Sequence, residues 1–153
     1  MQASDNRRAK EKALYLLEYR SHSKKELTDK ISRTASREAA EAAAQRMEEL
    51  GLLIDAAYAR ELARSLLNRK GYGVRRARQE LLQKGIDREL VEEILEEQAP
   101  DPREKLREIV ERKYQDRLRD EKGYRRTAAA LQRLGYGYED IRAVLREFSQ
   151  EED

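Results

Sequence analysis

The densest group of residues able to bind an anionic partner lies between Arg69 and Arg88. This stretch holds seven Lys and Arg residues and two acidic residues, which gives a local charge of +5. Such a charge attracts a polyanion or an acidic protein groove. The alternative is a solvated helix face, because 42% of the residues in this chain are charged and many of them must face water. The candidate binding residues are Arg69, Lys70, Tyr72, Arg75, Arg76, Arg78 and Lys84.

The residues around the basic stretch predict the helix that positions it. Val74, Ala77 and Leu81 have helical spacing. Gly73 permits a helix to begin before them, and Gly85 suits the left-handed position that follows a helix. Because the inward positions are apolar, we expect at least two of the three arginines of this helix to project outward.

A weaker copy of this stretch lies about fifty residues further along the chain. Its candidate binding residues are Lys122, Tyr124, Arg125 and Arg126. They surround Gly123 and are predicted to form a turn that leads into a helix ending at Gly135. Tyr72 and Tyr124 each lie beside a glycine and near arginine, so either ring could stack on a base or on a partner side chain. The alternative is a ring that folds back over the helix junction.

The residue types needed for enzyme chemistry are scarce. The absence of cysteine excludes thiol nucleophiles and thiolate metal sites, and it fits a reducing compartment. His22 is the only histidine and stands in a polar turn, which favours a structural or exposed role over catalysis. The Gly71-Tyr72-Gly73 segment lacks the Lys-Ser/Thr of a phosphate-binding loop. We therefore expect no catalytic residues, no cofactor and no metal.

The composition predicts an all-helical protein. The chain is rich in Ala, Glu, Lys, Leu and Arg, and only nine of its 153 residues are Gly or Pro. No segment combines alternating polarity with a run of Val, Ile or Thr, so we expect no strands. The sequence shows neither a signal peptide nor a run of ~20 apolar residues that could span a membrane. These features predict a soluble cytoplasmic protein.

Helix-start signals recur along the chain. Ser23 and Glu26 form a predicted capping box, in which each side chain bonds to the backbone amide of the other residue. Ser36, Asp55 and Asp101 are further predicted N-caps. Apolar positions also recur at a shift of about fifty residues, which indicates tandem repeats.

We therefore predict an all-α monomer of three tandem three-helix repeats that form an elongated, curved array. The predicted divisions are a disordered N-terminus (1–6), repeats at 7–54, 55–99 and 100–149, and an acidic tail (150–153).

Three segments give the chain a family resemblance. The runs Gly51-Leu-Leu-Ile-Asp-Ala-Ala-Tyr-Ala-Arg60 and Lys70-Gly-Tyr-Gly-Val-Arg-Arg-Ala-Arg-Gln-Glu-Leu-Leu-Gln-Lys-Gly-Ile86 resemble the signature of the bacterial RecX regulatory proteins. Ser23-Lys-Lys-Glu-Leu27 is similar to the motif of that family's first repeat. The similarity extends from about Arg7 to Phe148.

The resemblance implies three tandem three-helix repeats and an interaction with the filament of the RecA recombinase. A family member is expected to be a non-enzymatic regulator that mainly inhibits the ATPase, strand-exchange and coprotease activities of RecA in homologous recombination, DNA repair and the SOS response. The alternative is a sequence-independent protein that binds single- or double-stranded DNA through its Arg/Lys-rich helices without RecA. Salt dependence separates the two, since contacts to several DNA phosphates weaken steeply as salt rises.

Overall fold

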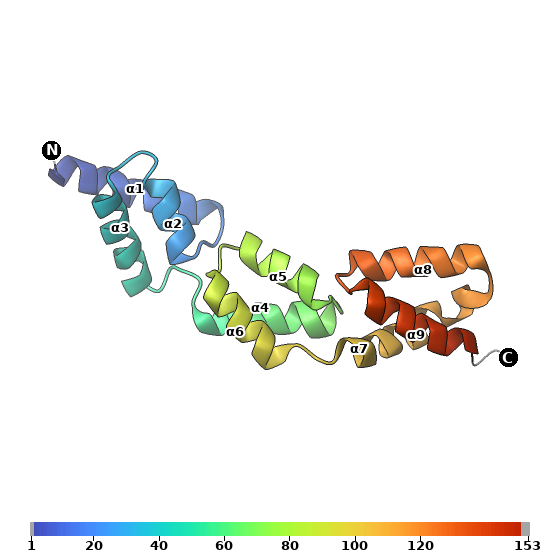
Figure 1. Ribbon diagram of the computed structural model, residues 1–153. Helices are drawn as coiled ribbons and strands as arrows, with labels where there is room; N and C mark the ends of the chain where they lie inside the picture. The colour runs from blue at the N-terminus through green and yellow to red at the C-terminus, as the bar shows by residue number, and fades with distance from the viewer. Residues whose placement is uncertain (1, 151–153) are drawn as a thin grey trace. The chain divides into compact units, whose positions relative to one another are not determined.

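Every regular element in residues 2–150, the range described by the computed structural model, is helical (Figure 1). The α-helices are α1 (Gln2–Tyr19), α2 (Lys24–Ile31), α3 (Arg37–Glu49), α4 (Ala56–Arg64), α5 (Val74–Gln83), α6 (Arg88–Gln98), α7 (Pro102–Ile109), α8 (Glu121–Arg133) and α9 (Tyr138–Gln150). The prediction of an all-α fold is confirmed. The elongated, curved arrangement and the repeat boundaries stay predictions.

Two kinds of irregular helix accompany the α-helices. The π-helical turns η1 (Ser65–Arg69) and η2 (Val110–Tyr114) follow α4 and α7, and the 3₁₀-helix η3 (Gln115–Arg119) follows η2. The chain divides into two compact units. The first contains the residues up to Arg60 together with Leu81–Glu92, and the second contains Glu61–Glu80 together with the residues from Glu93 onward. None of the described helices is long and apolar enough to cross a membrane.

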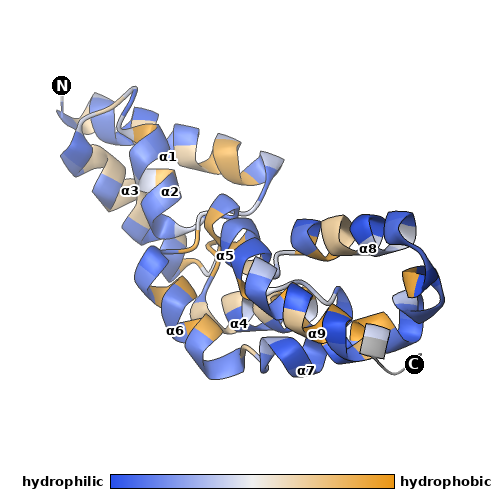
Figure 2. Cartoon of the chain, turned by 45° about the vertical axis from the view of Figure 1, so that its right-hand side comes forward, coloured by the Kyte–Doolittle hydropathy of each residue, from blue (hydrophilic) through white to orange (hydrophobic). Residues whose placement is uncertain are grey.

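The core of the first unit is built largely from alanine. Its buried residues are Ala9, Ala13, Leu27, Ile31, Ala39, Ala40, Ala43, Ala44 and Met47. Small side chains on α1 and α3 let these two helices approach closely, and the larger side chains of α2 and of Met47 fill the remaining space. Figure 2 shows the resulting pattern of mostly hydrophilic helices with narrow hydrophobic stripes.

The first helix begins earlier than the sequence predicted. Residues 1–6 were expected to be disordered, but α1 begins at Gln2, and Met1 lies outside the described residues. The carboxylate of Asp5 accepts a hydrogen bond from the Ser36 amide at 3.2 Å. Hydrogen bonding by the Ser36 side chain and then by this amide lowers the pKa of Asp5. This bond attaches the start of α1 to the start of α3. The hydrogen bond joins residues 31 positions apart, so the local sequence around Asp5 does not predict it.

The predicted N-caps are present, with one correction. The side chains of Ser23, Ser36, Asp55 and Asp101 each accept a hydrogen bond from a backbone amide of the helix that follows. The second half of the capping box is wrong, because the Glu26 carboxylate pairs with basic side chains instead of the Ser23 amide. Gly85 ends α5 in the left-handed conformation (φ +82°), as predicted.

The second unit contains a core that joins η2, η3 and α7 to α8 and α9. Its buried residues are Leu106, Ile109, Val110, Leu118, Leu131, Tyr136, Ile141, Val144 and Leu145. Arg107 reinforces the contact between α7 and α9 by donating two hydrogen bonds to the Glu147 carboxylate, at 2.8 and 3.0 Å. This bidentate contact lowers the pKa of Glu147. The predicted acidic tail beyond Gln150 lies outside the described residues.

The turn predicted around Gly123 is wrong, since this segment forms the first turns of α8. Asp120 is the N-cap, and its side chain accepts a hydrogen bond from the Gly123 amide at 2.6 Å. A Cβ at Gly123 would overlap the carbonyl oxygen of Arg117. The glycine therefore allows the preceding 3₁₀-helix to pass close to α8 and does not end a helix there.

Candidate partner-binding site

The basic stretch of the middle of the chain is anchored on the C-terminal end of α8. Four hydrogen bonds join the two segments, namely Gly73 N to Leu134 O (2.8 Å), Tyr136 Oη to Gly71 O (2.9 Å), Arg75 Nη2 to Gln132 O (2.8 Å) and Arg76 Nη1 to Arg133 O (3.1 Å). All of these residues belong to the second unit. We call this contact between Gly71–Arg76 and Gln132–Tyr136 the glycine clamp.

Two glycines make the close approach possible. A Cβ at Gly73 would lie 2.5 Å from the carbonyl oxygen of Gly135 and 2.9 Å from the amide nitrogen of Tyr136. Gly135 has φ +104°, and a Cβ there would lie 2.6 Å from the backbone nitrogen of Arg76. Since these neighbours are backbone atoms or a Cβ, they cannot move aside as a flexible side chain could. The clamp therefore requires glycine on both of its sides.

Tyr136 is the buried side chain of the clamp. Its side chain is 3% exposed, and its hydroxyl donates to the Gly71 carbonyl. Burial raises the pKa of Tyr136 to about 12, so the phenol stays protonated as the donor. The sequence analysis missed this residue. Its only signal was its place directly after the glycine that ends α8.

Arg75 and Arg76 have a structural role that their charge did not reveal. Each guanidinium donates to a carbonyl oxygen at the C-terminal end of α8, where unpaired carbonyls carry partial negative charge. Arg76 also lies 3.7 Å from Glu80. That Arg75 and Arg76 bind a partner stays a prediction, and any variant of either residue also changes the clamp.

The ring of Tyr72 makes cation–π contacts with two basic side chains of the same chain. The guanidinium carbon of Arg76 lies 4.0 Å from the ring centroid, and the ammonium of Lys70 lies 5.8 Å from it. Arg69 and Lys70 themselves are exposed, and the side chain of Arg69 donates to the Ser65 hydroxyl. Unlike Arg75 and Arg76, these two residues donate no hydrogen bond to the α8 carbonyls within the described part of the chain.

Arg78 is half-buried on α5, and the other candidates lie elsewhere on the two units. Lys84 is exposed directly after α5 in the first unit. Lys122, Arg125 and Arg126 are exposed on the first turns of α8, where Arg125 donates to Glu121 at 2.6 Å. Tyr124 is half-buried and packs against the core of the second unit. The prediction that the Tyr124 ring stacks on a base or on a partner side chain stays a prediction.

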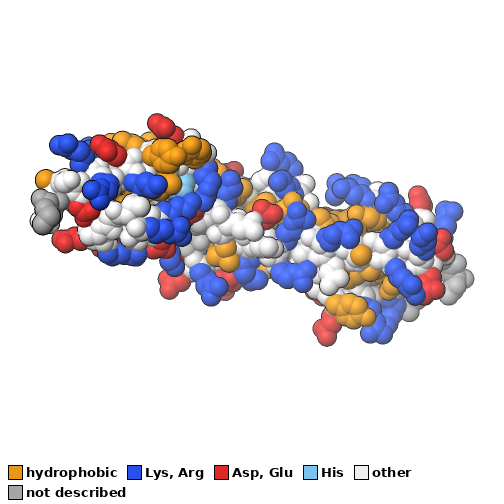
Figure 3. Space-filling view, turned by 90° about the horizontal axis from the view of Figure 1, so that it is seen from above, with side chains coloured by type: hydrophobic (Ala, Val, Ile, Leu, Met, Phe, Trp, Pro, Cys, Tyr) orange, Lys and Arg blue, Asp and Glu red, His pale blue; other side chains and the backbone are white. Residues whose placement is uncertain are grey.

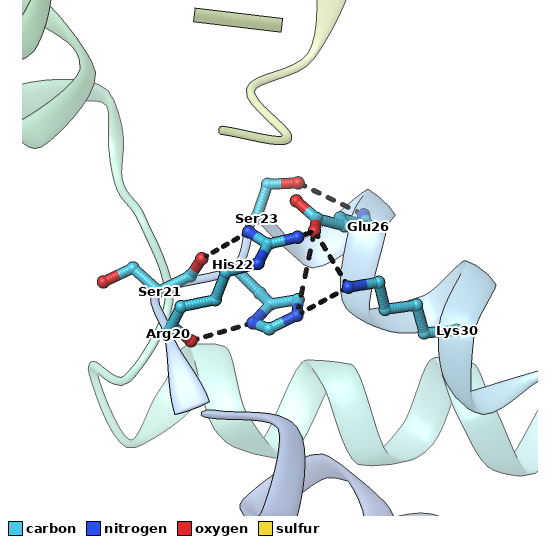
Figure 4. Close-up of polar contacts among 6 residues, drawn as sticks. All are labelled: Arg20, Ser21, His22, Ser23, Glu26 and Lys30. Carbon is cyan, nitrogen blue, oxygen red and sulfur yellow. Dashed lines mark hydrogen bonds and ion pairs between the residues drawn. The ribbon is translucent and has the colours of Figure 1, made fainter. Parts of the chain in front are cut away.

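His22 is buried, with 1% of its surface exposed, in a polar cluster of the first unit (Figure 4). Its Nδ1 donates to the carbonyl oxygen of Arg20 at 2.9 Å, which leaves Nε2 to accept from the Lys30 ammonium at 3.2 Å. Glu26 completes the cluster through ion pairs with Arg20 and Lys30. Burial lowers the pKa of His22, so its imidazole is neutral near pH 7.

This cluster connects two segments of the first unit. The backbone carbonyl of His22 accepts a hydrogen bond from the Ile54 amide at 3.1 Å, which connects the turn before α2 to the segment before α4. In residues 2–150 no three His, Cys, Asp or Glu side chains are grouped so that they could hold a metal ion. The structural role expected for His22 agrees with its burial.

Comparison with known proteins identifies the family. The model of the second three-helix domain of RecX matches residues 55–95, and the model of the third matches residues 101–145. Together they cover more than half of the chain. The chain belongs to the RecX family. The regulatory protein RecX of Stenotrophomonas maltophilia is 36% identical over 138 residues, which cover 89% of this chain and 84% of that protein.

Further RecX proteins support the assignment and the fold. The regulatory protein RecX of Pectobacterium atrosepticum is 38% identical over 138 residues, covering 90% of this chain and 83% of the relative. The crystal structure of RecX from Lactobacillus salivarius superposes with a TM-score of 0.69 at 23% identity, covering 97% of this chain and 99% of that one. At that identity the crystal structure supports the fold alone. The RecX resemblance expected from the sequence is confirmed.

Proposed function

We propose that the chain is a non-enzymatic cytoplasmic regulator that binds the RecA filament and mainly inhibits its ATPase, strand-exchange and coprotease activities. Membership of the RecX family carries this proposal, since the relatives are named regulatory proteins. The exposed cations at Arg69 and Lys70 support it, because they stand on a segment held in place by the glycine clamp. A positive surface on a held backbone suits an acidic protein partner, since only the side chains have to be ordered on binding.

Measurement of RecA's DNA-dependent ATP hydrolysis tests the proposal. Inhibition is expected at protein concentrations at which the chain alone does not bind the same DNA. Inhibition that appears only once the chain coats the DNA contradicts RecA binding and favours the alternative, a sequence-independent DNA-binding protein. In that case inhibition also weakens by orders of magnitude as salt rises from about 50 to about 200 mM.

A further inference from the structure

A cationic groove with a volume of about 840 Å³ lies along α8 in the second unit. We call it the α8 groove. Its basic lining residues are Arg117, Arg119, Lys122, Arg126 and Arg133, and its carboxylates are Asp116 and Asp120. Five positive and two negative side chains leave a net charge of +3. In Figure 3 Lys and Arg side chains gather on this part of the molecule.

The two carboxylates do not neutralise the groove. Asp120 is the N-cap of α8 and accepts from the Gly123 amide, whereas Asp116 lies 3.9 Å from Arg119. Within residues 2–150, the side chains of Lys122, Arg126 and Arg133 form no ion pair. Like charges facing one groove repel one another, so they do not stabilise the fold there. A bound anion would relieve this repulsion.

The wall of the groove contains a buried hydroxyl without a partner. Thr127 lines the groove with 1% of its surface exposed, and its Oγ1 has no hydrogen-bond partner among the described residues. Thr28, another buried threonine on a helix, donates to the carbonyl of Lys24 one turn earlier at 2.8 Å. An unpaired buried hydroxyl is costly, so a polar group that bonds to it would stabilise the site.

We propose that the α8 groove is a binding site for phosphate groups. The arginines can donate paired hydrogen bonds to phosphate oxygens, and the lysine adds a positive charge. The N-terminal end of α8, a helix of 13 residues, also favours negative charge. The Thr127 hydroxyl is closed off from the groove in this conformation, and a rotation of the side chain on binding would let it donate to a phosphate oxygen or to a bridging water molecule. Free phosphates and the phosphodiesters of a nucleic acid share this chemistry.

The site goes beyond the proposed regulation of RecA, although it includes Lys122 and Arg126, and its test contains no RecA. Pyrophosphate is titrated into the full-length protein at constant ionic strength and followed by calorimetry. Arg126→Gln combined with Lys122→Gln is expected to weaken binding by about tenfold or more, because two charged donors are lost. Arg142→Gln, which removes one positive charge from α9 outside the groove, is expected to leave affinity unchanged.

Thr127 provides a second, charge-neutral test. Thr127→Val keeps the shape and removes the donor, so we expect pyrophosphate affinity to fall several-fold, whereas Thr127→Ser is expected to retain it. A melting curve for each variant shows that it is folded. The proposal is overturned if folded wild-type protein binds no pyrophosphate and no oligonucleotide, or if Arg142→Gln weakens binding as much as the groove variants do.

A single-stranded oligonucleotide separates the two sources of phosphate. If its binding is reduced by the same groove variants, the site takes a nucleic-acid backbone. If only pyrophosphate binds in a manner sensitive to these variants, the site takes free phosphates. Both results support a phosphate site, and neither depends on whether the chain inhibits RecA.

Discussion

Gly73→Ala tests whether the glycine clamp organises the second unit. The new methyl group would lie 2.5 Å from the Gly135 carbonyl oxygen, where only backbone atoms surround it. The φ of Gly73 is not positive, so alanine adopts the same backbone conformation without strain. The Gly73 carbonyl accepts from the Ala77 amide, so this residue starts α5. The variant therefore adds a steric clash and little else.

The expected loss of stability follows from the contacts that must separate. Forcing a methyl group into a packed contact costs about 1–3 kcal/mol. Weakening two of the clamp's hydrogen bonds, Gly73 to Leu134 and Tyr136 to Gly71, costs about 1 kcal/mol each. The smaller entropy of the unfolded alanine variant returns about 0.4–1 kcal/mol. The net loss is about 2–4 kcal/mol, which at about 2–4 °C per kcal/mol lowers the Tm by roughly 4–16 °C.

Gly137→Ala is the matched control for this experiment. Gly137 starts α9 as Gly73 starts α5, and its φ is also not positive. A Cβ there meets nothing closer than the Asp140 carboxylate at 4.0 Å. Thermal melting followed by circular dichroism is expected to show a change within about 1 kcal/mol for this control. Equal Tm values for the two variants would refute the argument that the clamp depends on the close approach at Gly73.

Three further outcomes follow from the described contacts. Tyr136→Phe leaves the buried Gly71 carbonyl without its donor and is expected to cost about 1–3 kcal/mol in thermal melting, with the Tyr138→Phe variant at an exposed tyrosine unchanged. The pKa of His22 is lower in the folded chain than in the unfolded chain, so the unfolded chain binds the proton first as pH falls. The Tm of the wild type is therefore expected to fall as pH drops below about 6.5. The His22→Gln variant is expected to show a shallower fall in Tm and to keep RecA inhibition. Arg69→Glu with Lys70→Glu is expected to weaken RecA inhibition more than tenfold with an unchanged Tm, and undiminished inhibition would show that this surface does not bind RecA.

Local signals in the sequence predicted the helices well because the controlling interactions are also local. An N-cap such as Asp55 or Asp101 bonds to an amide two or three residues away, so its chemistry is complete within one turn. The left-handed glycine after α5 acts over a similarly short range. The π-helical turns after α4 and α7 were missed, since neither carries a residue type that marks it.

Contacts between distant segments could not be predicted in this way. The start of α1 depends on the bond from Asp5 to the Ser36 amide, and neither residue alone indicates it. Gly123 was interpreted as a turn because glycine usually permits one, but here it makes room for the Arg117 carbonyl. In both cases the decisive partner comes from another element. The residue type can be read from the sequence, but the contact that requires it depends on the fold.

The arginines show why charge alone cannot define the partner surface. Arg75 and Arg76 donate hydrogen bonds to carbonyl oxygens of α8. Replacing either arginine by an acidic residue therefore removes a clamp contact together with any partner contact. Loss of RecA inhibition in such a variant would have two explanations. Arg69 and Lys70 share the same segment but make no contact to α8 carbonyls. Because these two residues directly precede the clamp and do not form its hydrogen bonds, reversing their charges changes the surface proposed to bind RecA and leaves those hydrogen bonds in place.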